Sequence, residues 1–148
     1  MAPDAQTPRA ALCLLVAAAI GLAGPGRAEE VYLDRRCNRV EGPGEAFRVD
    51  YRRTLPSPEG TLRFSMARFQ DGSAIFCLTR PGAARGRLLA EETLQRQFIR
   101  DIRQEGERSS FLITVAYGNG RSVPLVQFRL NLNDPSHPEL IRLREWRE

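Results

Sequence analysis

The sequence predicts an α+β domain, in which one long amphipathic helix packs on an antiparallel sheet of about five to seven short strands. Several short segments alternate apolar and polar residues with the period of two that is typical of strands. One segment, residues 87–105, instead carries apolar residues at helical spacing. Two cysteines, Cys37 and Cys77, are expected to form one disulfide. A small β-barrel with a helical insertion is the alternative arrangement.

Residues 1–28 have the features of a cleavable secretory signal. Their apolar run of 14 residues is shorter than the roughly 20 residues that a membrane-spanning helix needs. A Gly-Pro-Gly breaker follows, and small residues at Gly26 and Ala28 place the cleavage after Ala28. An uncleaved membrane anchor is the alternative. Cleavage leaves residues 29–148 as one extracytoplasmic domain, secreted or periplasmic, with no stable membrane span.

The disulfide is expected because Cys13 leaves with the signal, so that an even number of cysteines reaches an oxidising compartment. A structural bond is the simpler interpretation, since a metal site would need more ligands and the chain has one histidine. No metal ion or other cofactor is predicted.

The first strand is predicted at residues 47–52, where apolar and charged residues alternate. Residues 61–69 and 74–79 follow as a hairpin around Asp71-Gly72, a two-residue turn of the primed kind. That turn would place Met66 opposite Cys77 and Ala67 opposite Phe76. Both faces of the hairpin are apolar, which is typical of a central strand pair that is covered on both sides.

The helix is predicted over residues 87–105 because Leu94, Phe98 and Ile102 recur at intervals of four, and Gly106 suits its C-terminal end. Residues 111–117 and 121–132 then form a second hairpin. Pro124 predicts an edge position or a bulge for the later strand. For the tail, residues 136–147, a short helix is expected, and a short strand is the alternative.

No catalytic residue is assigned from the sequence. Asp134, Ser136 and His137 resemble the components of a hydrolase triad, but their close spacing in a proline-bounded loop suits helix capping better. Paired carboxylates remain an alternative. They would come from the acidic residues on or just after the predicted helix: Glu91, Glu92, Asp101, Glu105 and Glu107.

The basic residues of the chain are all arginines. Residues 29–148 contain 20 arginines against 17 acidic residues, a balance too even to predict nucleic-acid binding. On the predicted helix, Arg96, Arg100 and Arg103 would share one arc. With Tyr117, beside the following Gly-Asn-Gly turn, they form the candidate binding face.

These observations predict a non-enzymatic domain that binds another macromolecule at or outside the cell envelope, as an inhibitor, adaptor or accessory protein. Its partner would be a protein, as yet unknown, or an anionic envelope polymer. A small extracytoplasmic hydrolase built on paired carboxylates is one alternative. A structural component that self-associates through the strand with Pro124 is the other.

Overall fold

The structure, a computed structural model, describes residues 29–118 and 120–148, and the predicted signal lies outside them. The described chain is nearly all β, so the prediction of an α+β fold is wrong. Its one helical element is the short 3-10 helix η1 (Glu92–Leu94), and no helix in this part is long and apolar enough to cross a membrane. The ten strands are β1 (Tyr32–Leu33), β2 (Arg39–Val40), β3 (Phe47–Leu55), β4 (Leu62–Arg68), β5 (Ser73–Thr79), β6 (Gly86–Leu88), β7 (Gln97–Gln104), β8 (Ser110–Ala116), β9 (Pro124–Asn131) and β10 (Glu139–Arg147).

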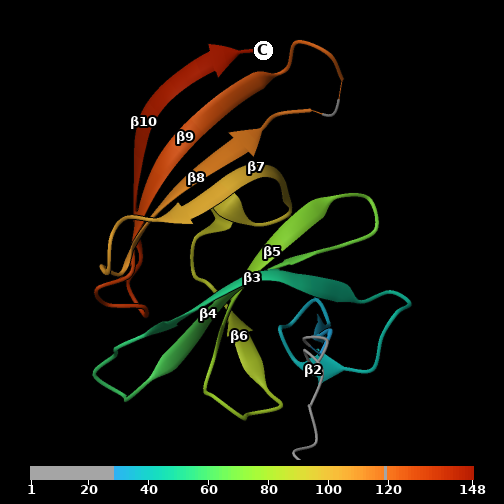
Figure 1. Cartoon of the computed structure of the whole chain (residues 1–148), viewed down its shortest axis with the longest axis vertical. Helices are drawn as coiled ribbons and strands as arrows, with labels where there is room; N and C mark the ends of the chain where they lie inside the picture. Colours follow the sequence, from blue (N-terminus) through green and yellow to red (C-terminus); the bar gives the residue numbers. More distant parts are fainter. Residues whose placement is uncertain (1–28, 119) are drawn as a thin grey trace, which may run out of the picture.

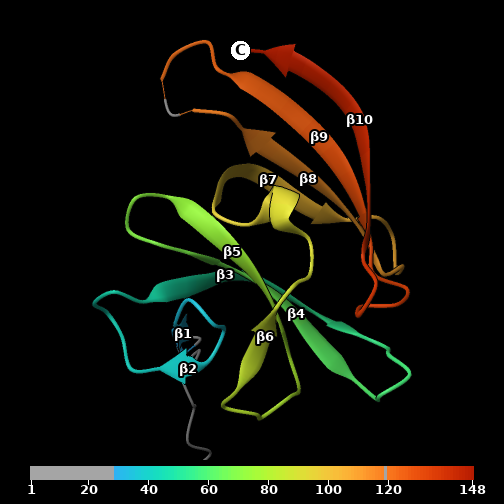
Figure 2. The same ribbon diagram turned by 180° about the vertical axis from the view of Figure 1, so that it is seen from behind.

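All ten strands belong to one antiparallel sheet with the order β10-β9-β8-β7-β5-β4-β3-β1-β2, and β6 pairs with β5 off this path. Strand β5 joins two halves, because its first residues pair with β7 and its last residues pair with β6. Figures 1 and 2 show β7–β10 in one half of the molecule and β3–β6 in the other. The order has two ends, β10 and β2, so it also differs from the closed barrel that was the alternative prediction.

The main core contains buried side chains from both halves of the sheet. Phe64 of β4 stacks on Phe76 of β5 with ring centroids 5.8 Å apart, and Phe111 of β8 lies 4.7 Å from Phe64. Such contacts join the two halves through apolar burial, the dominant favourable term in folding. The core residues are Leu55, Phe64, Met66, Ala74, Phe76, Leu78, Leu89, Leu94, Ile99, Phe111, Ile113, Val115, Val126, Phe128, Leu130 and Leu132.

The β4–β5 hairpin forms as predicted, but its register differs by one residue. The loop contains three residues, because the backbone N–H of Phe69 donates to the carbonyl of Ser73 (2.8 Å) and Gly72 adopts φ +92°. This is the geometry of a turn with a glycine bulge rather than of a two-residue turn. Met66 therefore faces Phe76, and Cys77 faces Ser65. Since side chains alternate between faces, the shift places Phe76 in the main core and Cys77 on the opposite face.

The segment expected to be helical, residues 87–105, contains most of β6 and all of η1 and β7. A β-bulge between Ile99 and Asp101 adds one residue to β7, so that Ile99 and Ile102 both pack against the main core although they are three residues apart. Leu94 is buried in η1, before Arg96 turns the backbone with φ +60°. Phe98, the middle residue of the predicted helical stripe, instead packs against a separate cluster with Ala116 and Leu125, so the spacing of four does not mark one buried face.

The C-terminal half-sheet confirms one sequence prediction and corrects two. Strands β8 and β9 pair as the predicted second hairpin, and Val126, Phe128 and Leu130 of β9 are buried in the main core. Pro124 is the first residue of β9, a position that tolerates proline, but β9 lies between β8 and β10 rather than at the edge. The tail forms β10 instead of the expected helix, because pairing with β9 supplies its hydrogen bonds.

Candidate anion-binding groove

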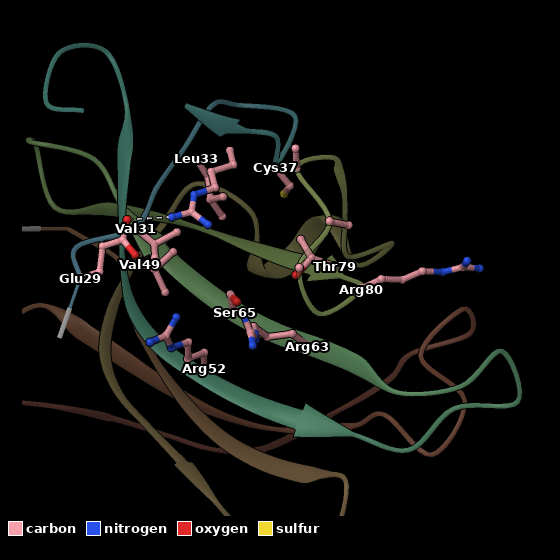
Figure 3. A pocket seen from close by; sticks show the side chains of 14 residues that line it. Glu29, Val31, Leu33, Cys37, Val49, Arg52, Arg63, Ser65, Thr79 and Arg80 are labelled. Atoms are coloured by element: carbon pink, nitrogen blue, oxygen red, sulfur yellow. Dashed lines mark hydrogen bonds and ion pairs between the residues drawn. The ribbon is translucent and has the colours of Figure 1, made fainter. Parts of the chain in front are cut away.

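A groove of about 220 Å³ lies on the face of β3, β4 and β5 that is turned away from the main core, which we call the outer face (Figure 3). The N-terminal segment borders it on one side, and the loop between β5 and β6 borders it on the other. Apolar side chains of Val31, Leu33 and Val49 line part of it. Its charged lining residues are Glu29 and four arginines: Arg39, Arg52, Arg63 and Arg80.

Two of these arginines come from the middle of the sheet. Arg52 of β3 pairs with Ser65 of β4, and Thr54 of β3 pairs with Arg63 of β4. Arg52 and Arg63 are consequently diagonal neighbours on one face, where long side chains can reach the same ligand. Figure 3 shows both side chains extending from the two strands into the groove.

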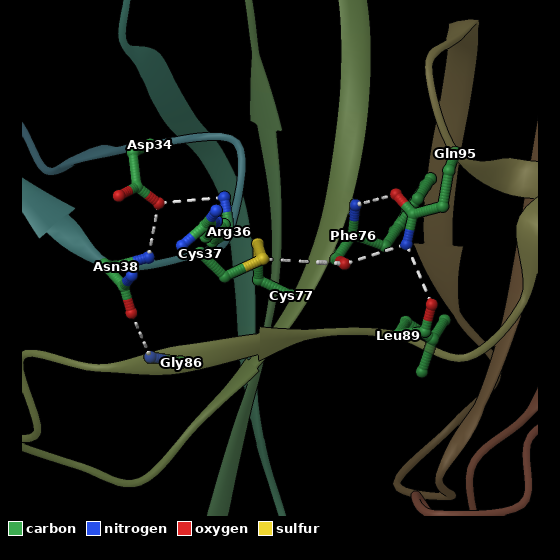
Figure 4. The surroundings of a disulfide bond; sticks show 9 residues. All are labelled: Asp34, Arg36, Cys37, Asn38, Phe76, Cys77, Gly86, Leu89 and Gln95. Atoms are coloured by element: carbon green, nitrogen blue, oxygen red, sulfur yellow. Dashed lines mark hydrogen bonds between the residues drawn. A yellow bond between two sulfur atoms is a disulfide. The ribbon is translucent and has the colours of Figure 1, made fainter.

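The Cys37–Cys77 disulfide, which confirms the predicted pairing, holds the N-terminal segment against the outer face of β5 (Figure 4). The two Cα atoms are 5.7 Å apart, within the usual range for a disulfide. Both cysteines are buried in a second apolar cluster with Leu33, Ala67 and Ile75. The cluster covers the part of the outer face beside the groove.

Backbone contacts fix the opposite wall of the groove to the N-terminal segment. The N–H of Arg39 donates to the carbonyl of Ala84 (2.7 Å), and the N–H of Gly86 donates to the side-chain oxygen of Asn38 (3.3 Å). Gly86 is required at this approach, because a Cβ atom there would lie 2.5 Å from the carbonyl oxygen of Cys37.

Asp34 shapes the turn that carries Cys37. Its Oδ1 atom accepts hydrogen bonds from the backbone N–H groups of Arg36 (2.8 Å) and Asn38 (2.9 Å), while Cys37 adopts φ +67° (Figure 4). Partial burial raises the pKa of Asp34, but these hydrogen bonds outweigh it and leave the pKa below its ordinary value. The ionised carboxylate therefore stabilises the turn.

The groove has an excess of positive charge. Arg39 pairs with Glu29 (3.0 Å), and Arg80 reaches Glu59 only at 3.9 Å. Within the described chain, neither Arg52 nor Arg63 forms an ion pair with a carboxylate. A guanidinium group presents paired N–H donors that match a carboxylate or a phosphate. The arrangement can thus bind an anionic group beside the apolar side chains of Val31 and Val49.

The structure separates the residues of the binding face that the sequence predicted, because the helix that would unite them is absent. Arg96 lies beside a different cleft of about 510 Å³, lined also by Phe47, Phe69 and Phe98. Arg100 pairs with Glu148 (3.0 Å), Arg103 is exposed on β7, and Tyr117 is exposed just after β8. Their role in binding stays a prediction.

The loop with Asp134, Ser136 and His137 does not have the geometry of a catalytic triad. Asp134 accepts from the Ser136 backbone N–H (3.1 Å) and lies 2.9 Å from the His137 ring, while the Ser136 hydroxyl accepts a hydrogen bond from Arg87 instead of contacting His137. The hydrogen bond with His137 lowers the pKa of Asp134. Elsewhere in the described residues, no group of three or more His, Cys, Asp or Glu side chains is placed to hold a metal ion.

Sequence reasoning identified Arg52 as a polar position on a strand but missed Arg39, Arg63 and Arg80. The sequence does indicate the orientation of Arg63. It stands between Leu62 and Phe64 in a strand, so its side chain must face away from the core. Arg39 and Arg80 come to the groove only through the folding of two loops. Comparisons of the chain with protein-family models, curated proteins and solved structures give no match.

Proposed function

We propose that this protein is an exported, non-enzymatic binding module that holds an acidic part of another macromolecule in the groove formed by Arg39, Arg52, Arg63 and Arg80. Export is supported by the signal features of residues 1–28 and by the disulfide. The partner lies at or outside the cell envelope.

One observation carries the proposal: Arg52 and Arg63 are neighbours on adjacent strands, and neither has a carboxylate partner among the described residues. Two like charges at this spacing repel each other, so that an anionic ligand between them gains attraction from both and relieves the repulsion. The half-buried side chains of Val31 and Val49 add apolar area that a peptide or polymer can cover.

The alternative of a hydrolase built on paired carboxylates has less support. Such an enzyme needs two converging acids, one of which stays protonated through a raised pKa. The described carboxyl groups with a clear shift are Asp34, Asp71 and Asp134, and in each the pKa is lowered. These carboxylates are therefore more strongly ionised than ordinary ones, which suits a structural role.

The groove can be tested with fluorescently labelled poly-L-glutamate as the acidic probe, with binding to the purified protein followed by anisotropy. The double variant Arg52→Glu, Arg63→Glu should weaken binding by about tenfold or more, because it removes two charged donors from the site. Binding to the original protein should also weaken as salt is added.

The matched control is Arg108→Glu with Arg121→Glu, which makes the same change of net charge at exposed positions in loops of the other half-sheet. It should retain most of the affinity. Equal losses in the two double variants would show a general charge effect and would contradict a binding groove. A partner from an envelope extract should be retained by the original protein and by the control, but not by the groove variant.

A further inference from the structure

Strand β3 is paired along only part of the edge that faces away from β4. Residues Phe47 and Arg48 pair with β1, and the N–H of Val49 donates to the carbonyl of Val31 (2.9 Å). After the bulge between Val49 and Tyr51, no described strand pairs with this side of residues 51–55. We call residues 51–55 of this side the free β3 edge. An unpaired edge presents N–H and C=O groups that another strand can bind.

The residues of the free β3 edge are mostly exposed. Arg52, Arg53 and Thr54 are all exposed. The carbonyl of Arg52 accepts a hydrogen bond from the Arg53 guanidinium (2.8 Å), a donor that a bound peptide could replace with its own N–H. The edge also adjoins the groove, because Arg52 belongs to both.

The charge along this edge selects for an acidic strand. Arg52 and Arg53 lie on it, and Arg63 lies beside it on β4. The nearest acid on β3, Asp50, is already paired with Arg68 (2.9 Å) and Arg48 (3.3 Å).

The other long free edge, that of β10, has a mixed charge pattern. There Arg142 pairs with Glu145 on the same strand, and Arg100 of β7 pairs with the C-terminal Glu148. Strand β10 thus carries two glutamates beside its three arginines, and its Arg144 and Arg147 donate to Gln127 and to the Ser122 carbonyl, whereas residues 51–55 carry two arginines and no acid. By charge, the β3 edge therefore favours an acidic segment more strongly than the β10 edge does.

We propose that an acidic segment of a partner protein binds as an added β-strand along the free β3 edge. Main-chain hydrogen bonds would supply affinity, and the arginines would supply selectivity, as in other cases of strand addition. Side chains of an added strand alternate between faces, so carboxylates at every second position meet Arg52 and Arg63 on the outer face. The inference rests on the proposed function and specifies the partner as an extended acidic peptide.

The test uses an eight-residue peptide in which glutamate alternates with threonine, and the purified protein. Two further peptides carry N-methyl groups on every second backbone nitrogen, in the two possible frames, and a fourth has lysine in place of glutamate. The parent peptide should bind. At least one N-methylated peptide should bind about tenfold more weakly than the parent. In that peptide the backbone N–H groups that face β3 are replaced by methyl groups, which cannot donate hydrogen bonds and which crowd the strand. The lysine peptide should not bind.

Substitutions in the protein test which of the two sheet edges binds the parent peptide. Arg52→Glu with Arg63→Glu should abolish binding of the parent peptide, whereas Arg144→Glu with Arg147→Glu at the β10 edge should leave it nearly unchanged. In hydrogen exchange, the amides of Arg52 and Thr54 should become protected when the parent peptide is present. Protection at β10 instead would overturn the proposal.

The remaining outcomes separate this inference from the proposed function. If both N-methylated peptides bind as tightly as the parent and binding still requires Arg52 and Arg63, strand addition is wrong and the groove proposal stands. The same holds if the parent peptide does not bind while poly-L-glutamate binds at the groove. If neither acidic probe binds, both proposals are overturned.

Discussion

Loss of the Cys37–Cys77 disulfide should lower the free energy of unfolding by about 4 kcal/mol, since closing a loop of this length removes about 13 cal/mol/K of entropy from the unfolded chain. The bond joins residues 40 positions apart in the sequence. The double substitution to alanine removes the bond without introducing a polar group into the cluster around Leu33 and Ile75, where both cysteines are fully buried. Removal of a native disulfide from a small secreted domain typically costs about 2–5 kcal/mol, a range that includes this entropy figure.

The corresponding change in melting temperature is about 16 °C, taking an unfolding entropy of about 2.1 cal/mol/K per residue for the 120 residues from 29 to 148. Urea unfolding followed by circular dichroism and by the fluorescence of Trp146 measures the same loss in free energy. Reduced original protein should match the double variant. An unchanged urea midpoint, with an unchanged slope, would refute the reasoning.

The disulfide also supports the binding site, because Cys37 lines the groove and holds the N-terminal segment beside it. The double variant should therefore bind poly-L-glutamate more weakly even where it remains folded. Hydrogen exchange should show faster opening of residues 31–40 than of β8 and β9, which lie in the other half-sheet.

Three further predictions concern the core, the groove wall and a turn. Phe76→Ala should cost about 3–5 kcal/mol in urea unfolding, because the ring is completely buried, and a cost below 1 kcal/mol would contradict the core described above. Gly86→Ala should cost about 1–3 kcal/mol, since its Cβ would meet Cys37 at 2.5 Å, whereas Gly120→Ala, where nothing lies within 4 Å, should cost less. The hydroxyl and N–H of Ser73 donate hydrogen bonds to Asp71 and lower its pKa. The Asp71 carboxylate therefore stabilises the hairpin at pH values above the ordinary aspartate pKa. This contribution is lost as the pH falls through the lowered pKa of Asp71. Asp71→Asn should thus be less stable than the original protein at pH 7 and equal to it in acid; a constant difference at all pH values would argue against this origin.

The prediction of a helix over residues 87–105 fails for a reason that local sequence cannot show. Periodicity predicts that Leu94, Phe98 and Ile102 are buried together. In the structure Phe98 packs on a separate cluster, and Ile99 joins Ile102 at the main core because β7 is a bulged strand. The choice depends on β8, which pairs with β7 along almost its whole length. The tail is a strand for the same reason: pairing with β9 supplies backbone hydrogen bonds to a segment that would otherwise suit a helix.

The candidate site was equally hard to predict in full. The disulfide could be inferred from cysteine count and export, and Arg52 from alternation along its strand. Arg39 and Arg80 lie in short or irregular segments without periodicity. They line the same groove as Arg52 only because the disulfide and the hydrogen bond between Arg39 and Ala84 bring two loops together, and the Arg80 side chain extends away from Arg52 and Arg63 (Figure 3).

The sequence by itself determined the strands from residue 47 to 79, those from 111 to 132, and the covalent link between Cys37 and Cys77, because alternation and cysteine pairing are local or countable properties. The tertiary structure alone decided the register of the β4–β5 hairpin, the strand character of residues 97–104 and 139–147, and the meeting of four arginines in one groove. These features depend on hydrogen bonds and apolar burial between segments far apart in the chain. The free energy of those contacts exceeds the weak secondary-structure preference of each segment alone.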